Sequence, residues 1–189
     1  MDYYDPHPTL QLERALALCG FMGSGVRSVA RGLSARTGLP LHDLQRSVES
    51  EAGMSWARIL LEQGPEALAE AEARALDRAL REAQPGIIAL SHGALLDAGI
   101  RETALAHTQL IYLERPLPVL FQRVVTQLLA RPASIAEFML GAPRNVDDLR
   151  PYFEAREPGY REAPVSLGAR DLHDGDIVET LLAELREGA

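Results

Sequence analysis

The amino-acid sequence predicts an α/β fold in which helices cover both faces of a parallel sheet. Five short apolar runs are spaced along the chain, and segments with helical periodicity separate them. Continuous apolar runs of this length are typical of strands buried on both faces, and their alternation with helices indicates βαβ units. The predicted strands are residues 15–20, 39–44, 86–90, 109–114 and 163–169.

The clearest helix is predicted over residues 65–84. Pro65 suits the first position of a helix, where its missing N–H group costs no hydrogen bond. Apolar side chains from Leu68 to Ala83 recur with helical spacing along one face, and Pro85 ends the segment. Further helices are predicted over residues 26–36, 48–64, 118–130, 146–156 and 176–187.

The first residues of the chain differ in composition from the rest. Pro6 and Pro8 interrupt residues 1–13, and this segment has no apolar period. We therefore expect a flexible N-terminal arm over residues 1–13 and one domain over residues 14–189. The length of 189 residues is sufficient for a single domain with its own core.

Composition and charge narrow the classes of function. The chain is 47% hydrophobic and 24% charged, as in ordinary globular proteins, and its formal net charge is -8. Because Glu and Arg are mixed in the same segments, no basic face is offered to a phosphate backbone, and direct nucleic-acid binding is not expected. The apolar runs are shorter than the roughly 18–20 residues that span a bilayer, and no signal peptide is recognisable. With a single cysteine, Cys19, placed as a packing residue inside the first predicted strand, the expected location is cytoplasmic, without membrane contact.

A glycine-rich turn joins the first predicted strand to the first predicted helix. Its sequence, GFMGSG, places Gly20, Gly23, Ser24 and Gly25 before the helix. In this layout successive backbone N–H groups can surround a phosphate at a helix N-terminus. The alternative is a tight strand-to-helix turn with no phosphate to bind.

The positions after this turn depart from the phosphate-loop motif G-x-x-x-x-G-K-[ST]. The motif requires a lysine and then a hydroxyl, whereas the chain has Val26 and Arg27, with Ser28 one place later. Shifting the register to use Arg27 and Ser28 would rotate the apolar positions about 100° off the buried helix face, so we reject it. The lysine stabilises charge on the transferred phosphoryl group and the hydroxyl ligates magnesium. Loss of one such contributor commonly costs ~10²–10³ in rate, and we expect a degenerate phosphate loop.

Six segments of the chain, in their order and spacing, resemble the shikimate kinase family of small P-loop kinases from about Leu16 to Leu185. They are GFMGSG, Asp43 after the second strand, residues 53–68, residues 87–94, Arg131-Pro132 and residues 154–163. The resemblance implies a three-layer α/β/α P-loop kinase fold with a five-stranded parallel sheet. It also implies an ATP site at the glycine turn and a mobile lid around Arg131.

Two positions that handle substrate in the family are replaced in this chain. The strand-end pair of aspartates matches Asp43 and Gln45, so the carboxylate that binds a sugar-acid hydroxyl is lost. An amide accepts such a hydrogen bond more weakly than a charged carboxylate does. The arginine that binds the substrate carboxylate falls at Ala69, so that anchor is lost too.

At other matched positions, larger side chains should fill part of the cleft that binds substrate in the family, and one arginine of that cleft is kept. The family's glycine triplet falls at Ser91, His92 and Gly93, and the first two side chains should occupy space that holds ligand in the family. Arg156 matches the second carboxylate-binding position, and its alternative role is to brace the C-terminal helix. Glu72 is also kept, on the long predicted helix.

These replacements lead to the hypothesis of a catalytically degenerate domain: a non-phosphorylating module for small-molecule binding, regulation or protein interaction. The expected partners are a small anionic ligand and a protein, and neither a cofactor nor a metal is expected. The alternative is an active ATP-dependent small-molecule kinase in which Arg27 substitutes for the lysine and Asp43 or Ser28 holds magnesium. A third alternative uses His92 and Asp43 as an acid–base pair. With His42 these two residues are also a candidate metal set.

Overall fold

The computed structural model describes residues 12–82, 85–130 and 142–187. The predicted α/β fold is confirmed, because five strands form one sheet in the order β2-β3-β1-β4-β5 and all neighbouring strands are parallel. The elements are β1 (Ala15–Cys19), α1 (Val26–Thr37), β2 (Leu41–Asp43), α2 (Leu44–Ala52), α3 (Trp56–Leu80), β3 (Ile87–Ala89), the 3₁₀ turn η1 (Ala94–Leu96), α4 (Ala98–His107), β4 (Thr108–Glu114), α5 (Leu117–Ala130), α7 (Val146–Arg161), β5 (Val165–Gly168) and α8 (Asp174–Glu187).

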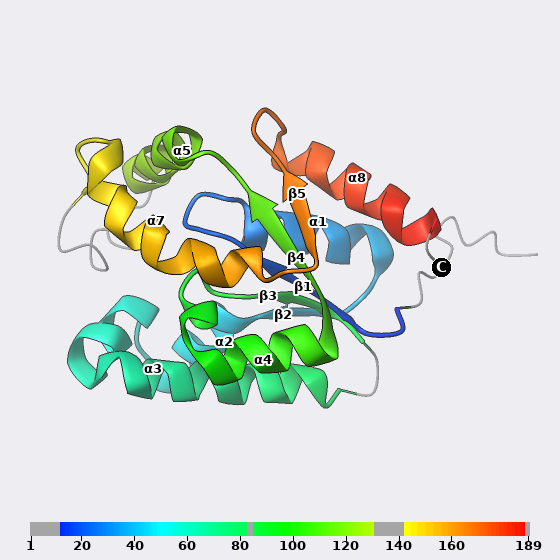
Figure 1. The fold of residues 1–189 in the computed structure, drawn as a ribbon. Helices are drawn as coiled ribbons and strands as arrows, with labels where there is room; N and C mark the ends of the chain where they lie inside the picture. Colours follow the sequence, from blue (N-terminus) through cyan, green and yellow to red (C-terminus); the bar gives the residue numbers. More distant parts are fainter. Residues whose placement is uncertain (1–11, 83–84, 131–141, 188–189) are drawn as a thin grey trace, which may run out of the picture.

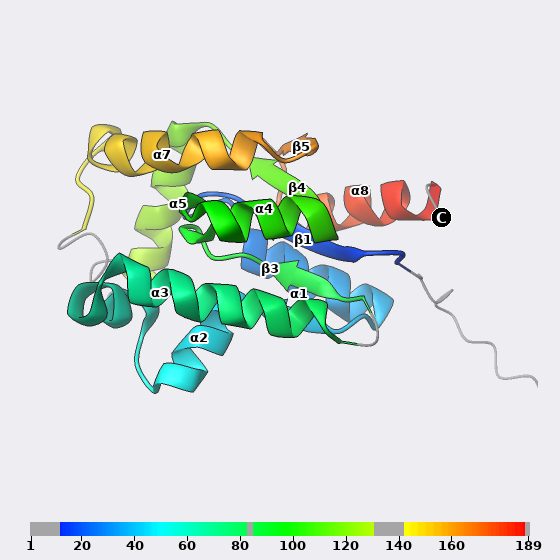
Figure 2. The same ribbon diagram turned by 60° about the horizontal axis from the view of Figure 1, so that its bottom comes forward.

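Helices cover the sheet on both faces and give the molecule three layers (Figure 1, Figure 2). The central strand β1 shows why, because its side chains alternate between two apolar clusters. Leu16 and Leu18 pack in the cluster that contains α1 and α8, whereas Ala17 and Cys19 pack in the cluster of α3, α4, α5 and α7. A strand covered in this way has no polar face, which explains its continuous apolar sequence.

The predicted helix over residues 48–64 is wrong in its boundaries. Gly53 adopts a φ of 65° and ends α2, a conformation that glycine reaches without a Cβ clash. Ser55 then begins α3 by accepting a hydrogen bond from the backbone N–H of Arg58. The helix continues to Leu80 with a kink at Gly64, where φ is 90° and ψ is 169°. The predicted start at Pro65 therefore marks this kink.

Two further helices differ from the prediction. Helix α7 extends to Arg161 and contains Pro151 and Pro158. Its first turn is fixed by a capping box in which Asn145 and Asp148 each accept a hydrogen bond from the other's backbone. Helix α4 was not predicted, although Asp97 caps it by accepting from the N–H of Ile100.

The sheet brings together the segments that follow three strands. Because β1, β2 and β3 are parallel, their carboxyl ends lie at the same edge of the sheet, where open α/β sheets bind ligands. The glycine turn, Asp43 and the segment from Ser91 follow these ends directly. The proposed N-terminal arm lies outside the described residues except for its last two positions, and it stays a prediction.

Candidate functional site

The glycine turn has the backbone that its glycines allow. Gly23 and Gly25 adopt φ values of 82° and 98°, and the backbone N–H of Ser24 donates to the carbonyl of Phe21 at 3.0 Å. A Cβ on Gly20 would approach Oγ of Ser24 to 2.6 Å, so this turn has no room for a side chain there. The expected order of strand, glycine turn and helix is therefore present.

Val26 and Arg27 occupy the first turn of α1. Val26 is buried in the apolar cluster shared with α8, whereas the Arg27 side chain is exposed. Nε of Arg27 lies 2.7 Å from Oδ2 of Asp43, and the other oxygen of Asp43 accepts from the backbone N–H of Arg46 at 3.1 Å. Both oxygens of Asp43 are thus engaged within the protein. Ser28 is exposed on α1.

A buried arginine that the sequence did not single out braces the glycine turn. Arg115 is 2% exposed and follows β4 directly. It donates to the carbonyls of Ser24 at 2.9 Å and Leu172 at 3.0 Å, to the carbonyl of Ala169, and to Asp174 at 3.2 Å. Burial lowers the pKa of Arg115. These bonds fix the turn to the segment that enters α8.

A second arginine, Arg123 of α5, completes the brace. It donates to the carbonyl of Gly23 at 2.5 Å and to Oδ1 of Asp174 at 2.7 Å. The Asp174 carboxylate also packs against Gly25, since a Cβ at that glycine would lie 2.6 Å from its Oδ1. In the sequence, the signal for this arrangement of Arg115, Arg123 and Asp174 is a charged residue, Arg115, placed directly after an apolar strand.

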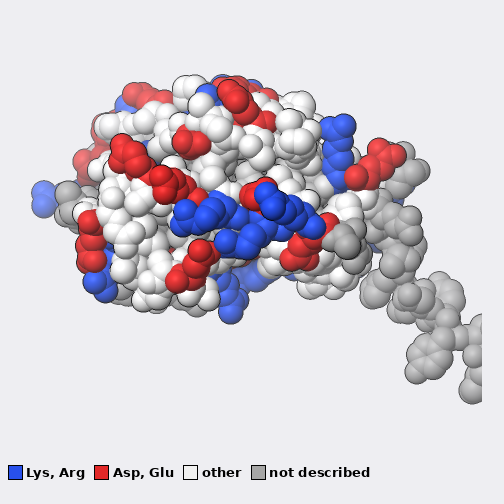
Figure 3. All heavy atoms as spheres, turned by 90° about the horizontal axis from the view of Figure 1, so that it is seen from below, with Lys and Arg blue, Asp and Glu red and all other residues white. Residues whose placement is uncertain are grey.

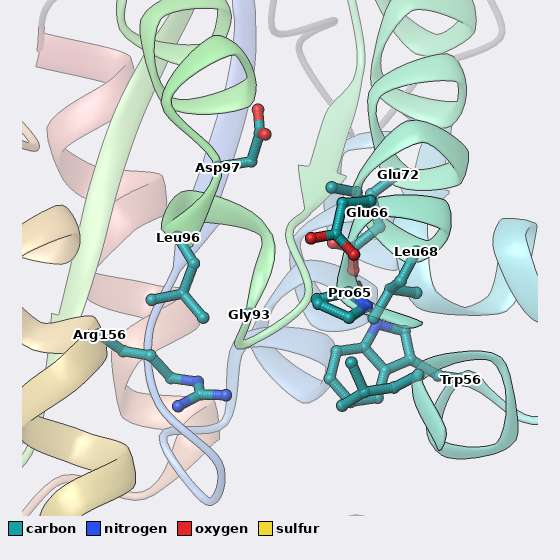
Figure 4. Close-up of a pocket in the computed structure, with 11 residues that line it drawn as sticks. Trp56, Pro65, Glu66, Leu68, Glu72, Gly93, Leu96, Asp97 and Arg156 are labelled. Atoms are coloured by element: carbon teal, nitrogen blue, oxygen red, sulfur yellow. Dashed lines mark hydrogen bonds between the residues drawn. The ribbon is translucent and has the colours of Figure 1, made fainter. Parts of the chain in front are cut away.

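A cleft of about 250 Å³ lies between α3 and the segment that enters α4. Trp56, Pro65 and Leu68 of α3 face Leu96 and Arg156 across it (Figure 4). Its lining consists of Trp56, Leu60, Pro65, Glu66, Leu68, Ala69, Glu72, Gly93, Leu96, Asp97 and Arg156. Three carboxyl groups therefore share this largely apolar cleft with one guanidinium group.

The expected cleft residues divide into two groups. Ala69, Gly93 and Arg156 line the cleft as expected. Asp43 instead contributes to a different hollow, and the side-chain amide of Gln45 donates to Glu49 at 3.0 Å. Neither Asp43 nor Gln45 is among the residues that line this cleft, and their part in a remodelled substrate site stays a prediction. Arg131, the expected lid residue, lies outside the described residues.

Glu72 links the cleft wall to the end of β3. Its Oε1 accepts from the indole Nε1 of Trp56 at 2.7 Å and from the hydroxyl of Ser91. Burial raises the pKa of Glu72, while these two donors and Arg156 act in the opposite direction. The network orients the indole ring as the floor of the cleft.

His92 packs behind this floor. Its ring centroid lies 4.8 Å from that of Trp56 and 6.5 Å from that of Phe21, and its carbonyl accepts from the hydroxyl of Tyr160. Burial, and then the charge of Arg156, lowers the pKa of His92 to about 3, so the ring is neutral near pH 7. A buried imidazole with so low a pKa is a weak base, which argues against an acid–base pair of His92 and Asp43.

The other candidate residues are not brought together. His42 faces Glu82 at 3.9 Å, and Asp43 pairs with Arg27. Over the ranges that the structure describes, no group of three or more His, Cys, Asp and Glu residues is arranged to hold a metal ion. The metal set of His42, His92 and Asp43 thus has no geometric support. Within the same ranges, no helix has the length and apolar character needed to cross a membrane.

Comparisons with known proteins agree on one family. The family model "Shikimate kinase" matches residues 22–186. The chain is 35% identical to shikimate kinase of Salinibacter ruber, with 88% of this chain and 84% of that protein covered. It is 32% identical to shikimate kinase of Caulobacter vibrioides, with 92% and 83% covered.

Solved structures show the same fold. Shikimate kinase from Acinetobacter baumannii, in complex with shikimate, superposes with a TM-score of 0.81 at 22% identity, covering 96% of this chain and 98% of that one. A gluconokinase from Sinorhizobium meliloti is more distant, with a TM-score of 0.60 at 17% identity and 95% of each chain covered. The described residues therefore have the three-layer α/β/α P-loop kinase fold.

Proposed function

Since this chain belongs to the shikimate kinase family, we propose that it keeps the family's fold and a small-molecule cleft but does not transfer phosphate. Its role would be regulatory, through a ligand in the cleft or through a protein partner. The observation that carries the proposal is the ion pair between Arg27 and Asp43 at the start of α1.

This ion pair stands where the phosphate-loop motif would place metal ligands. Arg27 holds the position of the hydroxyl that ligates magnesium, and its guanidinium group is bonded to the carboxylate that would support the same ion. A fixed positive charge beside Asp43 repels a divalent cation, and Val26 supplies no charge for a γ-phosphate. The residues present therefore do not fit a bound complex of ATP and magnesium.

No other segment can supply the missing ammonium group. All 19 basic residues of the chain are arginines, and it contains no lysine at all. An arginine is broader, planar and fixed by its hydrogen bonds, so it does not replace a lysine that moves with the phosphoryl group. Loss of the cation and of the metal ligand, each worth ~10²–10³ in rate, would leave little turnover.

The cleft supports binding of a small molecule other than shikimate. Ala69 gives no anchor for a carboxylate, and Glu66, Glu72 and Asp97 outnumber Arg156. Arg156 remains the cation for an anionic group, while Trp56 and Leu68 offer an apolar surface. Our expectation of a small anionic ligand therefore rests on Arg156 and is opposed by the excess of carboxyl groups in the lining.

The second candidate is an ATP-dependent small-molecule kinase, and the names of the relatives favour it. The relatives that the chain matches at 28–35% identity are called shikimate kinase, an activity that uses ATP and magnesium. The relatives therefore do not support our expectation that no cofactor is used. For this candidate to hold, Asp43 must exchange Arg27 for a metal ion, or Ser28 must hold the metal instead.

A melting experiment separates the two candidates. The full chain would be heated with ATP and magnesium, with ADP and magnesium, and with magnesium alone. A nucleotide at 100 times its dissociation constant adds about 2.7 kcal/mol of stability, which raises the melting temperature of a domain of this size by roughly 5–10 °C. We expect no shift beyond that of magnesium alone. A saturable, magnesium-dependent shift that Asp43→Asn removes would support the kinase instead.

A further inference from the structure

A second hollow, which we call the arginine groove, lies between α1, α2 and α3, apart from the cleft. It has a volume of about 630 Å³ and is lined by Arg27 and Arg31 of α1, Arg46, Ser47 and Ser50 of α2, and Arg78 of α3. Figure 3 shows that basic side chains gather across the middle of the face that lies lowest in Figure 1, with acidic side chains around them. These arginines gather on one face although the formal net charge of the chain is -8.

The groove carries more positive charge than its own acids neutralise. Asp43 pairs with Arg27 at 2.7 Å, and Glu51 pairs with Arg78 at 2.6 Å. Arg31 donates through Nε to the backbone carbonyl of Arg27, a bond that leaves its charge uncompensated. Among the described residues, neither Arg31 nor Arg46 has a carboxylate within ion-pair distance. Two guanidinium charges are therefore available to an anion.

The spacing of these side chains suits a phosphate group. Arg27 and Arg31 are four residues apart on α1, while Ser47 and Ser50 are three apart on α2, so each pair lies on one helical face. Guanidinium groups bind phosphate through two parallel N–H bonds, and serine hydroxyls can donate to the remaining oxygens. Because Arg27 contacts Asp43 through Nε, its Nη groups can reach a ligand without breaking that pair.

We propose that the arginine groove binds a small molecule bearing a phosphate group. A phosphomonoester or diphosphate matches the two uncompensated charges, whereas a single carboxylate would neutralise only one. The volume accommodates a small metabolite, and the acidic surroundings disfavour a long phosphate backbone. The site is separate from the cleft, and it requires no phosphoryl transfer by the protein.

Calorimetric titration of the full chain with pyrophosphate, without magnesium, tests this proposal. The variant Arg31→Gln/Arg46→Gln removes both free charges from exposed positions. The control Arg81→Gln/Arg150→Gln removes the same net charge from the C-cap of α3 and from α7, outside the groove. Circular dichroism would verify that both variants are folded.

We expect saturable binding that the groove variant weakens by about tenfold or more, while the control stays within about twofold. Binding that both variants weaken equally would reflect net charge alone and overturn the proposal. Binding that survives in the groove variant would place the anion elsewhere, for example at the glycine turn. Absence of binding to the unmodified chain would also overturn it.

Discussion

The indole Nε1 of Trp56 donates to Oε1 of Glu72 across 2.7 Å, and this bond joins the two parts of α3 on either side of the kink at Gly64. Trp56 lies in the first turn of the helix, while Glu72 lies two turns beyond the kink. Side chains separated by 16 residues along one helix meet only because the helix bends. The same bond orients the ring that forms the cleft floor.

Trp56→Phe tests this bond by removing the indole N–H while keeping an aromatic ring. It leaves a buried acceptor with one donor fewer, so we expect a loss of about 1–3 kcal/mol in the free energy of unfolding. Urea unfolding followed by circular dichroism measures the loss. Glu72→Gln is the matched control, because its amide oxygen can still accept from Trp56 and it should cost less. Equal stability of Trp56→Phe and the unmodified chain would show that the bond contributes nothing.

His92 should make the free energy of unfolding depend on pH. Its pKa is lowered to about 3 by burial and by Arg156, against an ordinary value of 6.5. Below about pH 6.5 only the unfolded chain takes up this proton, so stability falls by up to about 1.4 kcal/mol per unit as the pH decreases. Glu72 acts in the opposite direction, because its raised pKa lets the folded chain take up a proton first.

The variant His92→Asn separates the two contributions. Because asparagine cannot be protonated, the free energy of unfolding of this variant should decrease less than that of the unmodified chain between about pH 7 and pH 5. Urea titrations at several pH values give both curves. Parallel curves would contradict the lowered pKa of His92.

Truncating the Arg115 side chain should lower the free energy of unfolding strongly. Arg115→Met keeps much of the side-chain volume but leaves the carbonyls of Ser24 and Leu172 without this donor in a buried setting. We expect a loss of about 3–5 kcal/mol in the free energy of unfolding. Arg123→Met is the control and should cost less, since Arg123 is more exposed. A loss below 1 kcal/mol for Arg115→Met would mean that the brace is not structural.

Restoring the phosphate-loop side chains should restore nucleotide binding. In Val26→Lys/Arg27→Thr, the ammonium group returns, a hydroxyl enters the first turn of α1, and Asp43 loses its guanidinium partner. We expect the dissociation constant for ATP with magnesium to fall by about tenfold or more. Val26→Lys alone keeps Asp43 paired and should gain less. If both folded variants fail to bind, the backbone of the glycine turn no longer accommodates phosphate.

The strands β1 and β3 were predictable because their apolar runs are buried on both faces, as Leu16 and Leu18 illustrate with 0% exposure, whereas β5 is mostly exposed. The boundaries of the helices were less predictable. The end of α2 depends on the positive φ of Gly53, and α4 buries only Ile100 and Ala104, too few residues to give a periodic signal. The local sequence therefore predicted the buried strands better than it predicted where the helices begin and end.

In the site, replacements within a motif were visible in the sequence, whereas contacts between distant segments were not. Val26 and Ala69 could be recognised by position alone. The pairing of Arg27 with Asp43 depends on how β2 ends beside α1, and the partners of Arg115 lie up to 91 residues away along the chain. Only the folded structure brings such groups together.

The most direct test of the central claim is the rate of ADP formation by the unmodified chain with ATP, magnesium and shikimate, measured beside Asp43→Asn. The account predicts that both proteins form ADP no faster than the reaction without protein. It would be contradicted by magnesium-dependent ADP formation, matched by an equal amount of phosphorylated shikimate, that Asp43→Asn abolishes.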